Sequence, residues 1–181
     1  MRATENFFTC PAEAIFNFMH QEHSAERRVF KNVFDVREFL APLRAQGKRL
    51  VTTNGCFDII HSGHVRYLAE AAGLGDLLVV GVNADETVAR LKGPGRPVRR
   101  EDDRALVVAA LGMVDAAFIF REDDPRTFLE ALRPDVHVKG GDYTADIIER
   151  ATVERCGGRV AIVSYVNGYS TTSFVKKIRS A

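Results

Sequence analysis

The amino-acid sequence predicts an α/β protein, in the form of a Rossmann-like αβα layered domain with a five-stranded parallel sheet. From Gly47 onward, short runs of apolar or β-branched residues alternate with segments that have the spacing and end signals of helices. One of these runs, Leu77–Val82, is continuously apolar, which is typical of a strand that helices cover on both faces. Strands and helices that alternate in this way form parallel sheets with right-handed connections.

The expected elements follow one another in a regular order. The expected strands are 49–53, 77–82, 116–120, 136–138 and 159–164. The expected helices are 62–72, 85–91, 102–111, 124–132, 145–156 and 171–179. Asp124 and Pro125 give one helix a capping residue followed by a proline at the first helical position. Gly157 and Gly158 end the helix over 145–156.

The first 46 residues differ from this pattern. They are expected to form an N-terminal helical extension (residues 1–46) ahead of the main domain (residues 47–181). The segment Asp35–Gln46 has helical character, with Asp35 and Glu38 as a capping box and Pro42 as a residue that would disturb the helix. Phenylalanines stand at positions 7, 8, 16, 18, 30, 34 and 39. We expect these rings to pack on the domain, and a contact within a homodimer is the alternative.

Length and composition exclude several classes of protein. The chain has 181 residues, of which 46% are hydrophobic, and 25 Lys and Arg against 24 Asp and Glu give a formal charge of +1. This balance argues against a general nucleic-acid-binding or membrane-surface protein. The apolar runs are far shorter than the ~18 residues of a membrane span. Acidic residues interrupt the N-terminal region, so no signal peptide is expected.

The three cysteines, Cys10, Cys56 and Cys156, are odd in number and form no Cys-x-x-Cys pair. A disulfide framework or a zinc site is therefore not expected, and a reducing compartment fits. The sequence thus predicts a soluble, cytoplasmic protein.

The residues best suited to chemistry gather in the turn between the first expected strand of the domain and the helix that follows. Residues 53–64 read Thr-Asn-Gly-Cys-Phe-Asp-Ile-Ile-His-Ser-Gly-His, which places His61 and His64 at the start of that helix. Such a turn lies at the carboxyl edge of a parallel sheet, where ligands of open α/β folds bind. The helix N-terminus attracts phosphate. The two histidines therefore indicate a phosphate site, whereas the other three histidines lack such a setting.

A second polar segment, Arg90–Arg104, is rich in basic residues and contains two glycines and two prolines. A solvated loop is the simplest interpretation of such a charge run. The functional interpretation is a mobile clamp on phosphates, because a reaction between two polyanions needs cations to bring them together.

Two later segments carry weaker signals. Lys139-Gly-Gly-Asp-Tyr143 follows the fourth expected strand. Its glycines permit close backbone contact with a ligand, although a plain turn would explain them equally well, and Asp142 suits a ribose hydroxyl or an amine. Gly168–Thr172 precedes the last expected helix, and its hydroxyls either cap that helix or bind a phosphate at its N-terminus.

Asn54-Gly-Cys-Phe-Asp58 followed by His61-Ser-Gly-His64 resembles the signature of the cytidylyltransferase-like nucleotidyltransferases. Members of that family join a nucleoside triphosphate to a phosphorylated substrate and release pyrophosphate. The segments 81–85, 91–98, 138–143 and 168–172 look like those of its D-glycero-D-manno-heptose 1-phosphate adenylyltransferase branch, in the same order. The resemblance extends from about Leu40 to the C-terminus and leaves the first 35 or so residues outside it.

The resemblance implies a role for each candidate residue. It implies that His61, His64 and Lys92 are catalytic. It implies nucleotide contacts for Asn54, Gly55, Cys56, Phe57, Gly63, Lys139, Gly140, Asp142, Gly168, Tyr169, Ser170, Thr171 and Thr172. It implies contacts to the substrate phosphate for Asp58, Arg99 and Arg104. For Asp58, bracing the turn without touching a ligand is an equally weighted alternative, and the Cys56 thiol is not expected to act as a nucleophile.

The implied reaction transfers AMP from ATP to D-glycero-D-manno-heptose 1-phosphate and gives ADP-heptose and pyrophosphate, for lipopolysaccharide core or a related glycan. Mg²⁺ is expected to accompany ATP, held mainly by phosphate oxygens and water, with no metal bound by side chains. One alternative is a cytidylyltransferase that uses CTP and an alcohol phosphate or phosphonate. Another is a nucleotide-binding module without catalysis, against which the presence of both histidines argues. A dinucleotide oxidoreductase and a P-loop kinase are disfavoured because their glycine motifs are missing.

Overall fold

The structure is a computed structural model that describes residues 24–141 and 147–163. Its strands are β1 (Val29–Phe30), β2 (Leu50–Gly55), β3 (Leu77–Asn83), β4 (Ala116–Phe120), β5 (Val136–Gly140) and β6 (Arg159–Val163). A short 3₁₀ turn, η1 (Ala25–Arg28), precedes β1. The helices are α2 (Val33–Ala45), α3 (Ser62–Ala72), α4 (Asp85–Lys92), α5 (Glu101–Ala109), α6 (Arg126–Leu132) and α7 (Arg150–Arg155).

The strands form one parallel sheet in the order β1-β4-β3-β2-β5-β6. The predicted α/β class and the parallel sheet are confirmed, but the sheet has six strands and not five. The additional strand, β1, pairs with β4 at one edge. Its two residues lie between Arg28 and Lys31, so no apolar run of strand length marks it in the sequence.

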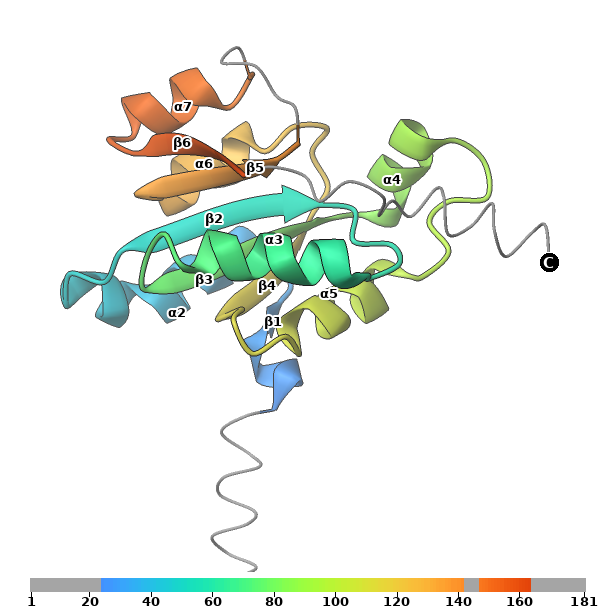
Figure 1. The fold of residues 1–181 in the computed structure, drawn as a ribbon, viewed down its shortest axis with the longest axis horizontal. Helices are drawn as coiled ribbons and strands as arrows, with labels where there is room; N and C mark the ends of the chain where they lie inside the picture. The colour runs from blue at the N-terminus through green and yellow to red at the C-terminus, as the bar shows by residue number, and fades with distance from the viewer. Residues whose placement is uncertain (1–23, 142–146, 164–181) are drawn as a thin grey trace, which may run out of the picture.

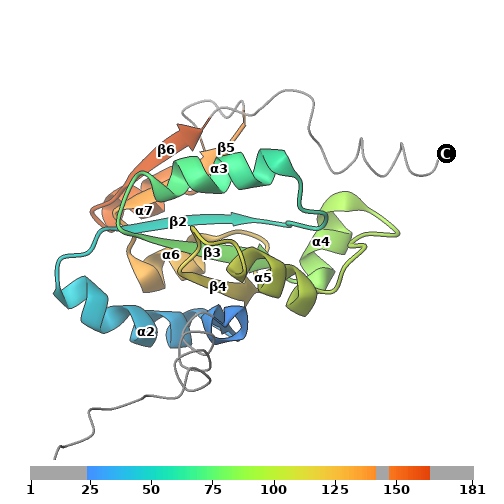
Figure 2. The same ribbon diagram turned by 60° about the horizontal axis from the view of Figure 1, so that its bottom comes forward.

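Helices cover the two faces of the sheet (Figures 1 and 2). One core cluster joins α3 and α5 to side chains of β2 to β6 on one face. A second cluster joins α2, α6 and α7 to the opposite face. All seven residues of β3 are buried, because consecutive side chains point to opposite faces and both faces are covered.

Part of the segment expected as an N-terminal extension packs with the sheet. Val36 and Leu40 of α2 are buried in the second core cluster, whereas Phe34 and Phe39 are 55% and 41% exposed. The N-cap of α2 is Asn32, whose side-chain oxygen accepts hydrogen bonds from the backbone N–H groups of Phe34 and Asp35. This cap stands in place of the expected capping box. The expected packing on the domain therefore holds for Phe30, which lies against this cluster, but Phe34 is largely exposed. A contact of these rings within a homodimer stays the untested alternative.

Two other expectations about helices need correction. The helix expected over 145–156 begins only at Arg150, and residues 145–146 lie outside the described residues, as does the expected helix 171–179. Pro42 does not interrupt α2, which continues to Ala45. Pro42 is exposed and stands in the last turn, where a missing N–H costs a single hydrogen bond.

Candidate active site

The candidate site lies where the order of the strands reverses. The chain passes from β2 to β3 on one side of β2, and later returns to place β5 on its other side. Ligands of open α/β sheets bind outside the carboxyl ends of the strands at such a point. Asn54 and Gly55 end β2 there, and Lys139 and Gly140 end β5. The helix α4 and the loop after it also stand at this edge, on the right of Figure 1.

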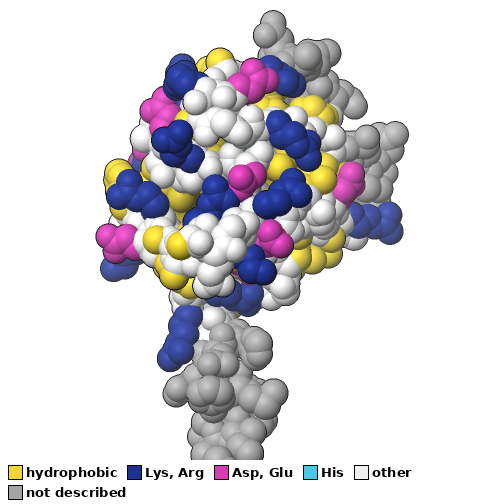
Figure 3. Space-filling view, turned by 90° about the vertical axis from the view of Figure 1, so that its left-hand side faces the viewer, with side chains coloured by type: hydrophobic (Ala, Val, Ile, Leu, Met, Phe, Trp, Pro, Cys, Tyr) yellow, Lys and Arg dark blue, Asp and Glu magenta, His cyan; other side chains and the backbone are white. Residues whose placement is uncertain are grey.

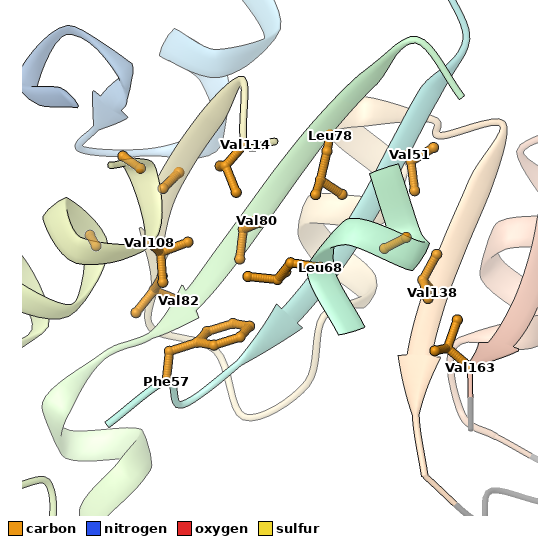
Figure 4. Close-up of a cluster of buried hydrophobic side chains, with 14 of the residues drawn as sticks. Val51, Phe57, Leu68, Leu78, Val80, Val82, Val108, Val114, Val138 and Val163 are labelled. Atoms are coloured by element: carbon orange, nitrogen blue, oxygen red, sulfur yellow. The ribbon is translucent and has the colours of Figure 1, made fainter. Parts of the chain in front are cut away.

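The turn after β2 is held by the ring of Phe57. This residue has a φ of 44°, which is uncommon for a side chain other than glycine. Its ring is 4% exposed and belongs to the core cluster, where Figure 4 shows it beside Leu68 and Val82. A Cβ on Gly55 would lie 3.1 Å from that ring. The Phe57 side chain is thus an anchor, and the predicted nucleotide contact of Phe57 stays a prediction for its backbone.

The two signature histidines stack at the start of α3. His61 is the N-cap of this helix, and its carbonyl accepts a hydrogen bond from the His64 N–H at 2.9 Å. The two ring centroids are 3.8 Å apart with an interplanar angle of 25°. The Phe57 ring lies 5.4 Å from the His64 ring. The anchored turn and the first turn of the helix therefore hold both imidazoles next to the free N–H groups of a helix N-terminus.

Burial favours the neutral form of both imidazoles. Burial lowers the pKa of His61. Burial, and to a smaller extent the neighbouring His61, lowers the pKa of His64 to about 4. A neutral imidazole keeps one N–H donor and one acceptor nitrogen. Each histidine can therefore donate a hydrogen bond to a phosphate oxygen, and a bound polyanion would favour the protonated form.

The basic loop, residues 93–100, connects α4 to α5 and lies against the turn after β2. Asp58 is 2% exposed. One oxygen of its carboxylate accepts hydrogen bonds from the backbone N–H groups of Val98 at 2.8 Å and Arg99 at 3.1 Å. The other oxygen pairs with Arg96 at 2.5 Å. Asp58 therefore braces this loop, and a contact of Asp58 with the substrate phosphate stays a prediction.

Arg104 joins four parts of the structure from inside the protein. Its side chain is fully buried. It donates hydrogen bonds to the carbonyl oxygens of Cys56, Asn83 and Arg99 at 2.5, 2.7 and 3.0 Å, and it pairs with Asp85 at 2.7 Å. These partners follow β2, end β3, lie in the basic loop and begin α4. The structure gives Arg104 a scaffolding role that the sequence analysis did not anticipate, and its predicted contact with a phosphate stays a prediction.

Positive charge gathers around Cys56. Burial raises the pKa of its thiol, although the charges of Lys92, Arg104 and Arg96 act in the opposite direction. A thiol with a raised pKa is a poor nucleophile, in line with the sequence analysis. Lys92 and Arg99 are exposed, so the site offers cations to a ligand from the solvent side.

Lys139 at the end of β5 is held by an acidic residue that the sequence analysis missed. Its ammonium pairs with Glu149 at 2.6 Å and donates to the side-chain oxygen of Asn54 at 3.3 Å. Glu149 is 4% exposed. A charged pair this well buried orients its members more than it stabilises the fold. The pair thus holds the side-chain oxygen of Asn54 through the Lys139 ammonium.

Tyr67 of α3 is the second residue that the sequence analysis missed. Its hydroxyl bonds to the Thr53 side chain at 2.5 Å and to the Val138 carbonyl at 2.9 Å, so it joins β2 to β5 at the point where the strand order reverses. A Cβ on Gly140 would lie 3.0 Å from its ring. A larger residue at Gly140 would thus have to displace the Tyr67 ring, and the contact of Gly140 with nucleotide stays a prediction.

Other predicted site residues are placed less fully. Asp142 and the segment Gly168–Thr172 lie outside the described residues. Gly63 stands in the first turn of α3. Within residues 24–141 and 147–163, no group of three or more His, Cys, Asp or Glu could hold a metal ion, and no helix is long and apolar enough to cross a membrane.

A cavity of about 350 Å³ lies at the opposite, amino edge of the sheet. Figure 3 shows this face, over which Lys and Arg side chains are spread with acidic ones between them. Arg44 in its wall pairs with Asp135 and donates to the carbonyl of Lys48. Cations at the ends of helices offset the partial negative charge of the terminal carbonyls, which explains this arginine as part of the fold. None of the predicted site residues lines the cavity.

Comparisons with known proteins agree with this geometry. A family model described as cytidylyltransferase-like matches residues 52–180. The bifunctional protein HldE of Geobacter sulfurreducens is 46% identical over 172 residues, which are 94% of this chain and 35% of that protein. HldE of Methylobacillus flagellatus is 51% identical over 138 residues, which are 76% of this chain and 28% of that protein. The chain thus spans about a third of the length of the curated relatives it matches.

A solved structure is similar over a larger share of its own length. The crystal structure of the lipopolysaccharide core biosynthesis protein from Thermoplasma volcanium is 34% identical to this chain, with a TM-score of 0.57. The match covers 68% of this chain and all of that one.

Proposed function

This chain belongs to the cytidylyltransferase-like family, and from that premise we propose that it is a nucleotidyltransferase that moves AMP from ATP to D-glycero-D-manno-heptose 1-phosphate. The products are ADP-heptose and pyrophosphate. The observation that carries the proposal is the stacked pair His61–His64 at the N-terminus of α3, beside the point where the strand order reverses. The choice of a heptose is supported by the similarity to the HldE proteins and to a lipopolysaccharide core biosynthesis protein.

The proposed chemistry is a direct displacement. An oxygen of the sugar 1-phosphate attacks the α-phosphorus of ATP, the bond from that phosphorus to the bridging oxygen breaks, and pyrophosphate leaves with the electron pair. No covalent intermediate on the protein is needed. Catalysis then consists of positioning the two phosphates and stabilising the charge that grows on the transferred group.

The side chains divide this work. His61 and His64 donate N–H groups to the triphosphate, and they gain strength as negative charge develops in the transition state. Lys92 and Arg99 offer cations on the solvent side of the same turn, where the second phosphate must approach. Arg104 and the Lys139–Glu149 pair hold the surrounding backbone and the Asn54 amide in place.

Mg²⁺ is proposed to enter with ATP. The described side chains around the turn are imidazoles, an ammonium, guanidinium groups and carboxylates already held in ion pairs, which is a poor donor set for this ion. Mg²⁺ prefers oxygen ligands and keeps several waters, often on substrate phosphates. When bound, it would neutralise part of the charge of the triphosphate, and its ligands would be phosphate oxygens and water.

The test is pyrophosphate release from a matrix of nucleoside triphosphates and sugar phosphates. We expect turnover with ATP and D-glycero-D-manno-heptose 1-phosphate, and little with hexose 1-phosphates. A preference for CTP with an alcohol phosphate would favour the cytidylyltransferase alternative. Absence of turnover with every pair, together with measurable ATP binding, would favour a binding module.

A further inference from the structure

Within the basic loop, the arginines do not all have the same neighbours. The Arg96 side chain is 14% exposed, and its partner Asp58 is 1% exposed. Arg99 and Arg100 are exposed. The charge of Arg96 is therefore paired inside the protein with the carboxylate of Asp58. The cations that face solvent at this edge are Lys92, Arg99 and Arg100.

Asp58 supplies several attachments of this loop. Three of them converge on its carboxylate, namely the Arg96 guanidinium and the backbone N–H groups of Val98 and Arg99. The Arg104 side chain donates a further hydrogen bond to the Arg99 carbonyl. At the two ends of the loop, backbone hydrogen bonds join Gly93 to Ala89 of α4 and Arg104 of α5 to Arg100. The sequence Gly93-Pro-Gly95 at the start of the loop gives it no element of its own, and both glycines have positive φ.

Asp58 also belongs to the turn that carries the histidines. It follows the anchored Phe57 directly and stands three residues before His61. One buried carboxylate thus connects the turn that would hold the triphosphate with the loop that carries the exposed cations. Among its contacts, the Asp58 carboxylate bonds to this loop, to Arg96, Val98 and Arg99.

We propose that Asp58 is a positioning residue that acts through Arg96 and the basic loop. It holds Arg99 at the distance from the histidine turn at which the second, attacking phosphate binds. This inference rests on the proposed function for the identity of that phosphate. The contact between Asp58 and the loop does not rest on it.

The first arm of the test needs no substrate. Trypsin can cut after Arg99 and Arg100 when the loop leaves the body of the protein, and mass spectrometry identifies the cleaved bonds. For Asp58→Asn, which keeps the shape but loses the charge, we expect cleavage there to accelerate about tenfold or more, because proteolysis of an opened segment follows its open population. Asp123→Asn is the matched control, since Asp123 pairs with Arg90 on the neighbouring helix in an exposed ion pair.

The second arm measures kinetics with the folded variants. For Asp58→Asn we expect the KM for the sugar 1-phosphate to rise about tenfold or more while kcat at saturation falls less, which is the pattern of lost substrate binding. Arg96→Met should reproduce this split, and the double variant should be little worse than either single variant, because both remove the same pair. Asp123→Asn should leave KM and kcat unchanged.

Three outcomes would overturn the proposal. They are wild-type cleavage rates in folded Asp58→Asn, additive effects of the two substitutions, and a loss of thermal stability in Asp58→Asn and Arg96→Met with unchanged KM for the folded fraction. If the wild-type protein turns over no sugar phosphate, the proposed function fails, and the cleavage arm still decides whether Asp58 holds the loop.

Discussion

Two neutral imidazoles, stacked 3.8 Å apart at a helix N-terminus, are suited to a polyanion. Each neutral ring has an N–H group that can donate a hydrogen bond to a phosphate oxygen. Burial reduces the competition of water for that hydrogen bond. The charge that they stabilise grows during the displacement, so their contribution should be larger in the transition state than in the complex with ATP. This distinction gives a prediction at the scale of the single residue.

Replacement of His64 by alanine should lower kcat by about 10²–10³, the usual cost of one preorganised donor to developing negative charge. The dissociation constant for ATP should change much less. Steady-state kinetics and calorimetric titration with ATP measure the two quantities. Arg66→Ala, an exposed position on the same helix, is the control. A near-normal kcat for His64→Ala would remove His64 from the catalytic machinery.

Lys92 ends α4 and is exposed. Its replacement by alanine should lower kcat/KM while the free energy of unfolding stays within about 0.5 kcal/mol, as is usual for exposed positions. Initial rates and thermal unfolding of the same preparation test this. A large drop in Tm with unchanged kinetics would show instead that Lys92 is structural.

At the scale of elements, Tyr67 and Gly140 fit α3 against β5. The Tyr67 hydroxyl joins the Thr53 side chain to the Val138 carbonyl, and a Cβ on Gly140 would lie 3.0 Å from its ring. This contact sets the spacing between α3, which carries the histidines, and β5, which carries Lys139. A small change in packing here should be felt at the site.

Gly140→Ala should therefore destabilise the protein by about 1–3 kcal/mol, the usual cost of overpacking a close contact. Denaturant unfolding at pH 7.5 measures it. Gly112→Ala is the matched control, because a Cβ there meets nothing within 4 Å, and it should have almost no effect. Equal unfolding midpoints for the two variants would mean that Tyr67 moves aside at no cost.

The sequence predicts elements well where they are long and regular. The strand over 116–120 and the helix over 62–72 have the predicted bounds, because a continuous apolar run and an apolar stripe are both local signals. The sequence analysis missed β1 because a strand of two residues is too short to show an alternation of apolar and polar residues. The start of α7 was placed too early, because Gly157 marks where a helix ends and nothing comparable marks where this one begins.

The same difference between local and long-range signals applies to the candidate site. The motif around His61 and His64 is contiguous, so its position at the end of a strand could be predicted. Tyr67 could not, because its partner Gly140 is brought to it only by the pairing of β2 with β5. Glu149 could not, because no motif marks it in the sequence ten residues after its partner Lys139. The family resemblance implied a phosphate contact for Arg104, and only the fold shows that backbone carbonyls surround its side chain.

At the scale of the whole molecule, stability is linked to pH through buried histidines. His137 is fully buried on β5, where its Nδ1 bonds to the Thr52 hydroxyl at 2.9 Å. Burial, with a smaller effect of Lys139, lowers its pKa to about 3. The unfolded chain would bind a proton at its ordinary pKa of about 6.5. Protons therefore favour the unfolded state below that pH.

The free energy of unfolding should be constant between pH 8 and 7 and fall as the pH drops from 6.5 toward 5. Each buried histidine should contribute up to about 1.4 kcal/mol per pH unit. Denaturant unfolding at several pH values measures this slope. His64→Ala should have a shallower slope than wild type, since the pKa of His64 is also lowered, to about 4. A free energy of unfolding that does not change between pH 7 and 5 would contradict the burial of neutral histidines.

We propose that this molecule makes ADP-heptose, and a competition between nucleotides tests this function most directly. Adenine needs a wider slot than cytosine, and its N1 acceptor must meet a hydrogen-bond donor on the protein. A buried polar group that meets the wrong base and stays unpaired can discriminate strongly. ATP and CTP, at equal concentration with Mg²⁺, are offered together with D-glycero-D-manno-heptose 1-phosphate, and the two sugar nucleotides are quantified by mass spectrometry. We predict that ADP-heptose dominates and that its formation is lost in His64→Ala. Dominance of CDP-heptose, or a higher kcat/KM with CTP, would contradict the assignment as an adenylyltransferase.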